Sequence, residues 1–291
     1  MTKLARFVPL CIFGVAFAAS LSAWAVSYTT IDFPGATATG LAGGPNPQGT
    51  SVGFYVDASG VVHGFTLTSH GVFTSFDPPG STLTIANFIS PEGMIVGQFN
   101  DSSNVSHGFV LYRGQYTTFD VPGAPGTVLT GINPSGEMSG FTCLADPSCA
   151  TGPFESFTVS KHGEITSFNP PGALSSTAST VNPSGTLVGS YTDSAGVGHG
   201  YQLYHGSFTT IDYPGATFTF VGGNNAEGDS VGLYTDAANV SHSFLLSHGV
   251  FTGFDPPGAV FSDAAGINPG GIIVGIYFDS ANVEHGYIRT P

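Results

Sequence analysis

Aspartate and histidine recur at regular spacing along this 291-residue sequence, so their chemistry is the first question. One aspartate opens an Asp-x-Pro-Gly motif at Asp32, Asp77, Asp120, Asp212 and Asp255, and Asn169 takes its place in one copy. A second aspartate closes a Val-Gly-x-aromatic-x-Asp motif at Asp57, Asp101, Asp193, Asp236 and Asp279. A histidine stands six residues after each of these, at His63, His107, His199, His242 and His285.

These carboxylates allow two interpretations. Aspartate and turn carbonyl oxygens are ligands that Ca²⁺ prefers, so the five aspartates of the second motif are candidates for a cation site. Alternatively, each aspartate caps its own turn, and each histidine is structural and hydrogen-bonds an aspartate across a hairpin. Repetition favours the structural interpretation, because a specific site is usually built once. No cofactor other than Ca²⁺ is indicated.

One repeat departs from the pattern and contains two unmatched carboxylates that are the first candidates for catalysis. Phe141-Thr142-Cys143 replaces the usual aromatic-x-Asp, Glu155 replaces the histidine, and the unit is six residues longer than most. Glu137 and Glu155 are therefore the weak candidates for general acid–base catalysis, which needs specifically placed groups. The alternative is a surface-loop insertion without a function of its own.

Cys143 and Cys149 lie close together in the same irregular repeat. In an exported protein such a pair predicts a disulfide. Two free thiols or a metal pair are less favoured, because cysteine metal sites use shorter spacings and further ligands.

The elements that position these residues follow from a six-fold repeat. The Asp-x-Pro-Gly motif and its Asn169 variant recur at spacings of 45, 43, 49, 43 and 43 residues, which is typical of a solenoid, propeller or array. Each unit contains four short strands separated by Gly/Pro turns, and the variable second strand is rich in small residues. We predict an all-β fold, a six-bladed β-propeller of four-stranded repeats with the variable strand innermost.

The two ends of the chain support this prediction. The predicted strand at 28–32 matches the first strand of a unit, and the predicted strand at 285–289 matches the fourth. One unit is therefore split between the two ends. These strands can pair only if the N-terminal strand closes the ring beside the C-terminal one. A solenoid would end in caps instead, and outer-membrane barrel strands would be longer. In the propeller, both sets of aspartates share one end of the molecule, here called the Asp-rich face.

Composition and charge exclude some partners. The formal charge is −14, charged residues make up 8% of the chain, and 42 glycines and 20 prolines disfavour helices. Nucleic acid and anionic lipid are excluded as main partners because both require clustered Lys and Arg.

The N-terminus predicts export. Lys3 and Arg6 precede an apolar run, and Ala23-Trp24-Ala25 is typical of a cleavage site, so residues 1–25 are interpreted as a signal peptide cleaved after Ala25. The apolar run is too short for a membrane span. We expect a single secreted or periplasmic domain, residues 26–291, that acts as a monomer without a membrane span.

The repeated triplets resemble a known family. His63-Gly64-Phe65 and its copies, together with Val-Gly-x-Tyr and Asp-x-Pro-Gly, resemble the HAF family of extracellular repeats, which is named after a His-Ala-Phe triplet. The resemblance covers residues 26–291 and implies an extracellular location, but it implies no activity.

Two classes of function remain. The first is a non-enzymatic extracellular binding or scaffold module that engages a glycan or a protein. The second is a secreted polysaccharide hydrolase or lyase with its site on the Asp-rich face. The even repetition of the motifs favours the binding module, and fold alone cannot decide.

Overall fold

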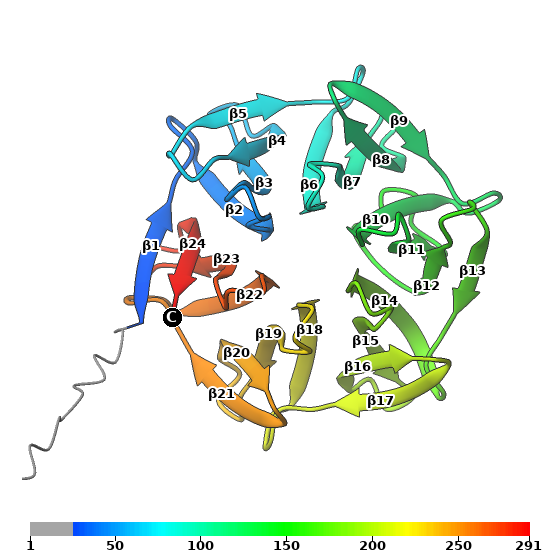
Figure 1. Ribbon diagram of the computed structural model, residues 1–291, viewed down its shortest axis with the longest axis vertical. Helices are drawn as coiled ribbons and strands as arrows, with labels where there is room; N and C mark the ends of the chain where they lie inside the picture. Colours follow the sequence, from blue (N-terminus) through cyan, green and yellow to red (C-terminus); the bar gives the residue numbers. More distant parts are fainter. Residues whose placement is uncertain (1–25) are drawn as a thin grey trace, which may run out of the picture.

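The computed structural model of the protein describes residues 26–291, in which all regular structure is β-strand. The predicted signal peptide lies outside the described residues. Neighbouring strands pair antiparallel in groups of four, and six such groups, called blades 1 to 6, surround a common axis (Figure 1). Single parallel pairs, Val62 with Leu83 and Gly198 with Phe218, link blade 1 to blade 2 and blade 4 to blade 5.

The first three blades follow one another along the chain. Blade 1 consists of β2 (Ala38–Gly43), β3 (Ser51–Val56), β4 (Val62–Leu67) and β5 (Phe73–Phe76). Blade 2 consists of β6 (Leu83–Ile89), β7 (Ile95–Asn100), β8 (Ser106–Tyr112) and β9 (Gln115–Phe119). Blade 3 consists of β10 (Gly126–Ile132), β11 (Met138–Cys143), β12 (Phe154–Val159) and β13 (Ile165–Phe168).

The last three blades include both ends of the described chain. Blade 4 consists of β14 (Ala173–Val181), β15 (Leu187–Asp193), β16 (Gly198–Tyr204) and β17 (Ser207–Ile211). Blade 5 consists of β18 (Phe218–Asn224), β19 (Ser230–Thr235), β20 (Ser241–Ser247) and β21 (Val250–Phe254). Blade 6 consists of β22 (Phe261–Ile267), β23 (Ile273–Phe278), β24 (Glu284–Thr290) and β1 (Ser27–Ile31).

Blade 6 is assembled from the two ends of the chain, as predicted. Strand β1 pairs antiparallel with β24, from Ser27 opposite Thr290 to Ile31 opposite Gly286. Figure 1 shows the variable strands nearest the axis; these are β2, β6, β10, β14, β18 and β22. The outermost strands are β1, β5, β9, β13, β17 and β21. The prediction of an all-β, six-bladed propeller with innermost variable strands is therefore confirmed.

The apolar core is divided among the blade–blade interfaces. Five of six clusters of buried side chains join neighbouring blades, as where Leu41 and Phe65 of blade 1 pack with Val274 of blade 6. In the sixth, buried residues of blade 4 pack against the partly buried Phe168 of blade 3. Ile31 of β1 packs against the cluster of Leu41, Phe65 and Val274. Strand alternation supplies both faces of each blade with apolar side chains, so every blade is buried on two sides.

The strand next to the innermost one contains a glycine in every blade, and the reason is steric. A Cβ at any of the six would overlap the carbonyl oxygen of the innermost strand and, in several blades, an aromatic ring of the strand that follows the glycine strand. The positions are Gly53, Gly97, Gly140, Gly189, Gly232 and Gly275. The glycine of the Val-Gly motif thus lets the aromatic ring lie close over the sheet.

The end opposite the Asp-rich face is formed by the turns between the first two strands of each blade. We call it the Asn-Pro face, made of residues 46–49, 90–93, 133–136, 182–185, 225–228 and 268–271. Asparagine amides link neighbouring turns: Asn182 Nδ2 donates to the Asn225 carbonyl at 2.9 Å, and Asn225 Nδ2 donates to the Asn268 carbonyl at 3.3 Å. This arrangement ties the blades together around the axis.

Candidate functional site

The repeated histidines lie between two aspartates on the Asp-rich face. His63 Nδ1 is 2.7 Å from Asp77 Oδ2, and His63 Nε2 is 3.5 Å from Asp57 Oδ2. The same arrangement occurs around His107, His199, His242 and His285. In blade 6 the partner of His285 Nδ1 is Asp32 at 2.7 Å, so this pair connects the C-terminal strand to the N-terminal strand.

The second-motif aspartates also cap their own turns. Asp57 Oδ1 accepts hydrogen bonds from the backbone N–H of Ser59 at 2.8 Å and of Val61 at 2.9 Å. Together with the Ser59 hydroxyl, these bonds lower the pKa of Asp57 to about 2. Backbone hydrogen bonds likewise lower the pKa of Asp101, Asp193, Asp236 and Asp279.

The neighbouring carboxylates in turn change the pKa of the histidine. Partial burial of the His63 ring lowers its pKa, but hydrogen bonds and the negative charges of Asp77 and Asp57 outweigh this and raise the pKa above 6.5. Every member of this cluster has a structural partner. This arrangement is expected of residues that stabilise the fold rather than of an open binding site.

The cation candidates are distributed over five blades instead of converging on one point. Within residues 26–291, no group of three or more His, Cys, Asp or Glu side chains is arranged to hold a metal ion. The oxygen Oδ1 of each candidate aspartate is engaged by its own turn. Binding of Ca²⁺ by these aspartates stays a prediction.

In the irregular blade 3, a pair of Glu155 and Asn169 replaces the histidine–aspartate pair. Asn169 Nδ2 donates to Glu155 Oε1 at 3.4 Å, where the other blades place histidine against aspartate. An aspartate at position 169 would bring two carboxylates together, which is unfavourable. The sequence shows that Glu155 replaces a histidine and that Asn169 replaces an aspartate. It does not show that these two residues, which are 14 positions apart, form a pair.

The two glutamates proposed as catalytic candidates lie far apart. Met138 pairs with Val159 at one end of β11, and Thr142 pairs with Glu155 at the other. At about 3.3 Å per residue, Glu137 and Glu155 are separated by roughly 16 Å along the strand, beyond the separations of about 5–9.5 Å used in glycoside hydrolysis. Glu137 instead accepts a hydrogen bond from Asn133 at 2.7 Å. The structure therefore does not bring them together as a catalytic pair.

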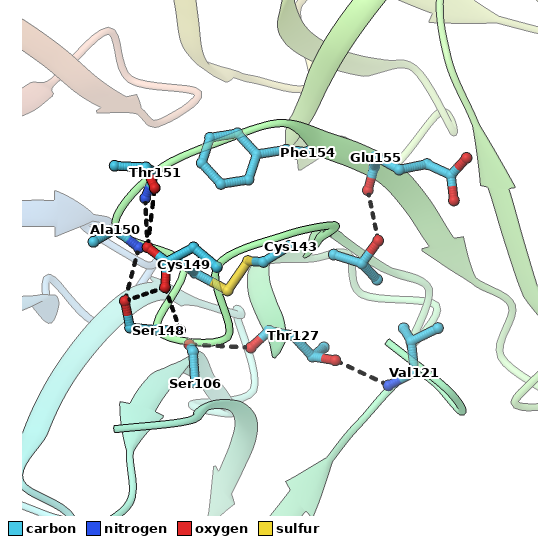
Figure 2. Close-up of a disulfide and its surroundings, with 12 residues drawn as sticks. Ser106, Val121, Thr127, Cys143, Ser148, Cys149, Ala150, Thr151, Phe154 and Glu155 are labelled. Atoms are coloured by element: carbon cyan, nitrogen blue, oxygen red, sulfur yellow. Dashed lines mark hydrogen bonds between the residues drawn. A yellow bond between two sulfur atoms is a disulfide. The ribbon is translucent and has the colours of Figure 1, made fainter. Parts of the chain in front are cut away.

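The predicted disulfide between Cys143 and Cys149 is present, with Cα atoms 5.3 Å apart (Figure 2). It closes the inserted loop of blade 3. That loop contacts blade 2, because the Ser106 N–H donates to the Pro147 carbonyl at 2.8 Å, and Ser106 Oγ donates to the Thr127 carbonyl of β10. Figure 2 shows the Glu155 carboxylate directed away from the disulfide. The insertion thus fastens blade 2 to blade 3.

Sequence analysis missed Asp263, on the innermost strand β22. Its Oδ1 is buried without a hydrogen-bond partner, and burial raises the pKa of this carboxyl to about 7. The corresponding residues of blades 2 and 3, Ile85 and Val128, are apolar. The only sequence signal is a carboxylate within a strand made of small and apolar residues.

A groove of about 420 Å³ lies between blades 6 and 1. We call it the closure groove, because β1 forms one wall, and the β4–β5 turn with Ser51 and Phe73 forms the other. Ser51 stands where blades 2, 3, 4 and 6 carry Ile95, Met138, Leu187 and Ile273, and where blade 5 also carries a serine, Ser230. The small side chain of Ser51 leaves space that a larger side chain occupies in those four blades.

The walls of the closure groove combine two kinds of surface. Hydroxyl groups and one carboxylate come from Thr29, Asp32, Ser51, Thr68 and Ser69. Apolar surface comes from Ile31, Leu67, Phe73, Ile272 and Ile288. No Lys or Arg lines the groove.

Comparison with solved structures gives the same architecture. A triple mutant of AofleA from Arthrobotrys oligospora superposes with a TM-score of 0.56 at 10% identity, covering 90% of this chain and 86% of that chain. The fold is a six-bladed β-propeller. A mutant Aleuria aurantia lectin in complex with alpha-methyl-L-fucoside has a TM-score of 0.54 at 11% identity, covering 86% and 90% of the two chains.

TolB from Acinetobacter baumannii has a TM-score of 0.58 at 11% identity, covering 83% of this chain and 64% of that one. At such identities the likeness shows the fold alone. No family model and no curated protein matches the sequence. The resemblance to HAF repeats therefore rests on the repeated motifs themselves. No helix among residues 26–291 has the length and apolar character needed to cross a membrane.

Proposed function

We propose that this protein is an exported, non-enzymatic binding module that binds a neutral glycan in the closure groove. The observation that carries the proposal is the groove itself, whose volume of about 420 Å³ lies within the range of small-molecule sites. The closure groove is larger than the groove of about 290 Å³ at the equivalent place between blades 3 and 4. The two grooves also differ in lining, because Glu137, Glu164 and His205 line the smaller one.

The chemistry of the groove fits a sugar. A pyranose ring presents hydroxyl groups at its edges and C–H groups on its faces. Threonine and serine hydroxyls donate and accept hydrogen bonds, and the Asp32 carboxylate accepts them. The ring of Phe73 and the aliphatic walls supply apolar surface for the C–H groups.

The negative charge of the protein determines which class of glycan we expect to bind. Residues 26–291 contain three basic and 19 acidic side chains, which gives a formal charge of −16. Asp32 lines the groove, and its side chain is 57% exposed. Sulfated and uronic-acid glycans are therefore repelled, and neutral glycans are preferred.

Two further observations support a binding role. Propellers of the same fold include lectins solved with alpha-methyl-L-fucoside and with Fucalpha1-6GlcNAc. The candidate catalytic glutamates do not converge, and the histidine–aspartate clusters are engaged in turns. Export is supported by the apolar N-terminus after Lys3 and Arg6 and by the disulfide, which is stable in oxidising compartments.

A glycan array probed with residues 26–291 tests the proposal, and Thr29→Arg is the informative variant. Thr29 is exposed and lines the groove, so arginine there should abolish the signal without disturbing the fold. Thr209→Arg is the matched control, because Thr209 holds the same position in β17 but lines no cavity found here. Binding that survives Thr29→Arg would overturn the assignment of the site.

The enzyme alternative is tested on the same protein preparation. A polysaccharide-degradation screen should show no turnover. Turnover of any polymer that disappears in Glu155→Gln would replace the binding module by a hydrolase or lyase.

A further inference from the structure

We propose a second binding site on the molecular axis, at the Asn-Pro face, which accepts the single apolar ring of an uncharged or cationic small molecule. All six blades contribute to a pocket of about 120 Å³ at this point. We call it the axial pocket. It is separate from the closure groove, and the inference is independent of the proposed function.

The floor of the axial pocket is aliphatic. Ile89, Ile132, Val181 and Ile267 are the last residues of innermost strands in four blades, and all four line the pocket. These strands surround the axis in Figure 1. The corresponding position of blade 5 is Asn224, whose amide is already engaged: Nδ2 donates to the Thr186 carbonyl at 3.0 Å, and Oδ1 accepts from Thr180 Oγ1 at 2.9 Å.

The rim of the pocket is made of proline rings. Five of the six turns place a proline there: Pro47, Pro91, Pro134, Pro183 and Pro269. The sixth turn has Ala226 at the same position. Proline has no backbone N–H, so the rim offers carbon surface rather than donors.

Five of the six asparagine side chains that line the pocket both donate and accept hydrogen bonds within the protein. Asn182 Oδ1 accepts from the N–H groups of Ser184 and Thr186, both at 3.0 Å, and its Nδ2 donates to the next turn. A pocket with engaged polar groups and carbon walls favours an apolar guest. An apolar cavity of about 150 Å³ is known to hold benzene, so the axial pocket accommodates one ring at most.

Charge restricts the guest further. The turns around the mouth carry Glu92 and Glu227, both exposed, and contain no Lys or Arg. An anionic substituent at the mouth is therefore disfavoured, whereas a neutral or cationic one is tolerated.

Benzyl alcohol, benzylamine and benzoate form a matched probe series, and saturation-transfer NMR measures their binding to residues 26–291. We expect binding of benzyl alcohol and benzylamine and at least tenfold weaker binding of benzoate. Ala226→Trp, at an exposed turn position, should cover the mouth and abolish the signal. Ala226→Pro reproduces the other five turns and should retain it.

Three results would overturn the proposal. One is the lack of a signal from benzyl alcohol with the wild-type protein up to the solubility limit of the probe. A second is binding that is unchanged in Ala226→Trp while its melting temperature equals that of the wild type. The third is benzoate binding as strong as that of benzyl alcohol.

Discussion

Asp263 makes the sharpest quantitative prediction of the structure, because its buried carboxylate has no partner. Burial disfavours the charged form, and the pKa of Asp263 is raised from 3.8 to about 7. The folded state therefore prefers the protonated acid, while the unfolded chain ionises near pH 3.8. Folding stability is lost as the pH rises from 3.8 through 7, and the full loss persists above pH 7.

The size of the loss follows from the shift. At about 1.36 kcal/mol per pKa unit, a rise from 3.8 to about 7 corresponds to at most about 4 kcal/mol. The residue is half-buried overall, although its Oδ1 is fully covered, so we expect about 2–4 kcal/mol. Asp263→Val, which copies Val128 of blade 3, should recover this amount above pH 7.

The assay is urea unfolding of the wild type and of Asp263→Val at about pH 4 and about pH 8. The variant should be more stable by about 2–4 kcal/mol at the higher pH, and the difference should become small at the lower pH. Asp263→Asn separates charge from packing, since it removes the charge and keeps the shape. An equal gain for Asp263→Val at both pH values, or no gain at pH 8, would refute the reasoning.

Three further sets of predictions concern the repeated clusters, blade 3 and blade 6. First, protonation of the second-motif aspartates should destabilise the fold as the pH falls below about 4, because their folded pKa values lie below 3.8. His63→Ala should cost more stability near pH 5.5 than near pH 9, since the raised pKa of His63 stabilises the fold below about 6.5 and this contribution is lost as the pH rises. Equal costs at both pH values in thermal unfolding would contradict this. Second, Asn169→Asp should destabilise blade 3 by up to about 1 kcal/mol, and adding Glu155→His should restore stability. A double-mutant cycle without coupling would count against the pairing. Third, deletion of residues 26–33 removes Tyr28 and Ile31 from two apolar clusters and should cost about 2–5 kcal/mol or more. An unchanged melting temperature would show that β1 is dispensable.

Local sequence signals were sufficient to predict the architecture. The Asp-x-Pro-Gly and Val-Gly motifs gave the strand boundaries, because Pro, Gly and Asp have defined roles in turns. The split terminal unit predicted the pairing of β1 with β24, because only a ring reunites those two strand types. The disulfide followed from the short spacing of Cys143 and Cys149.

The candidate sites depended on packing that the sequence does not display. The walls of the closure groove come from β1 and from the β4–β5 turn, which are adjacent only after β1 has paired with β24. Asp263 lies in the variable strand, where no motif marks a buried position. Glu155 was interpreted as an unmatched carboxylate, although Asn169 is its partner.

The stoichiometry of glycan binding tests the central claim most directly. The closure groove between blades 6 and 1 differs in volume and lining from the equivalent groove between blades 3 and 4, so isothermal titration with the strongest ligand from the array should give one site per chain. That site should be lost in Thr29→Arg and kept in Thr209→Arg. Five or six equivalent sites per chain, or one site that is indifferent to Thr29→Arg, would contradict the account.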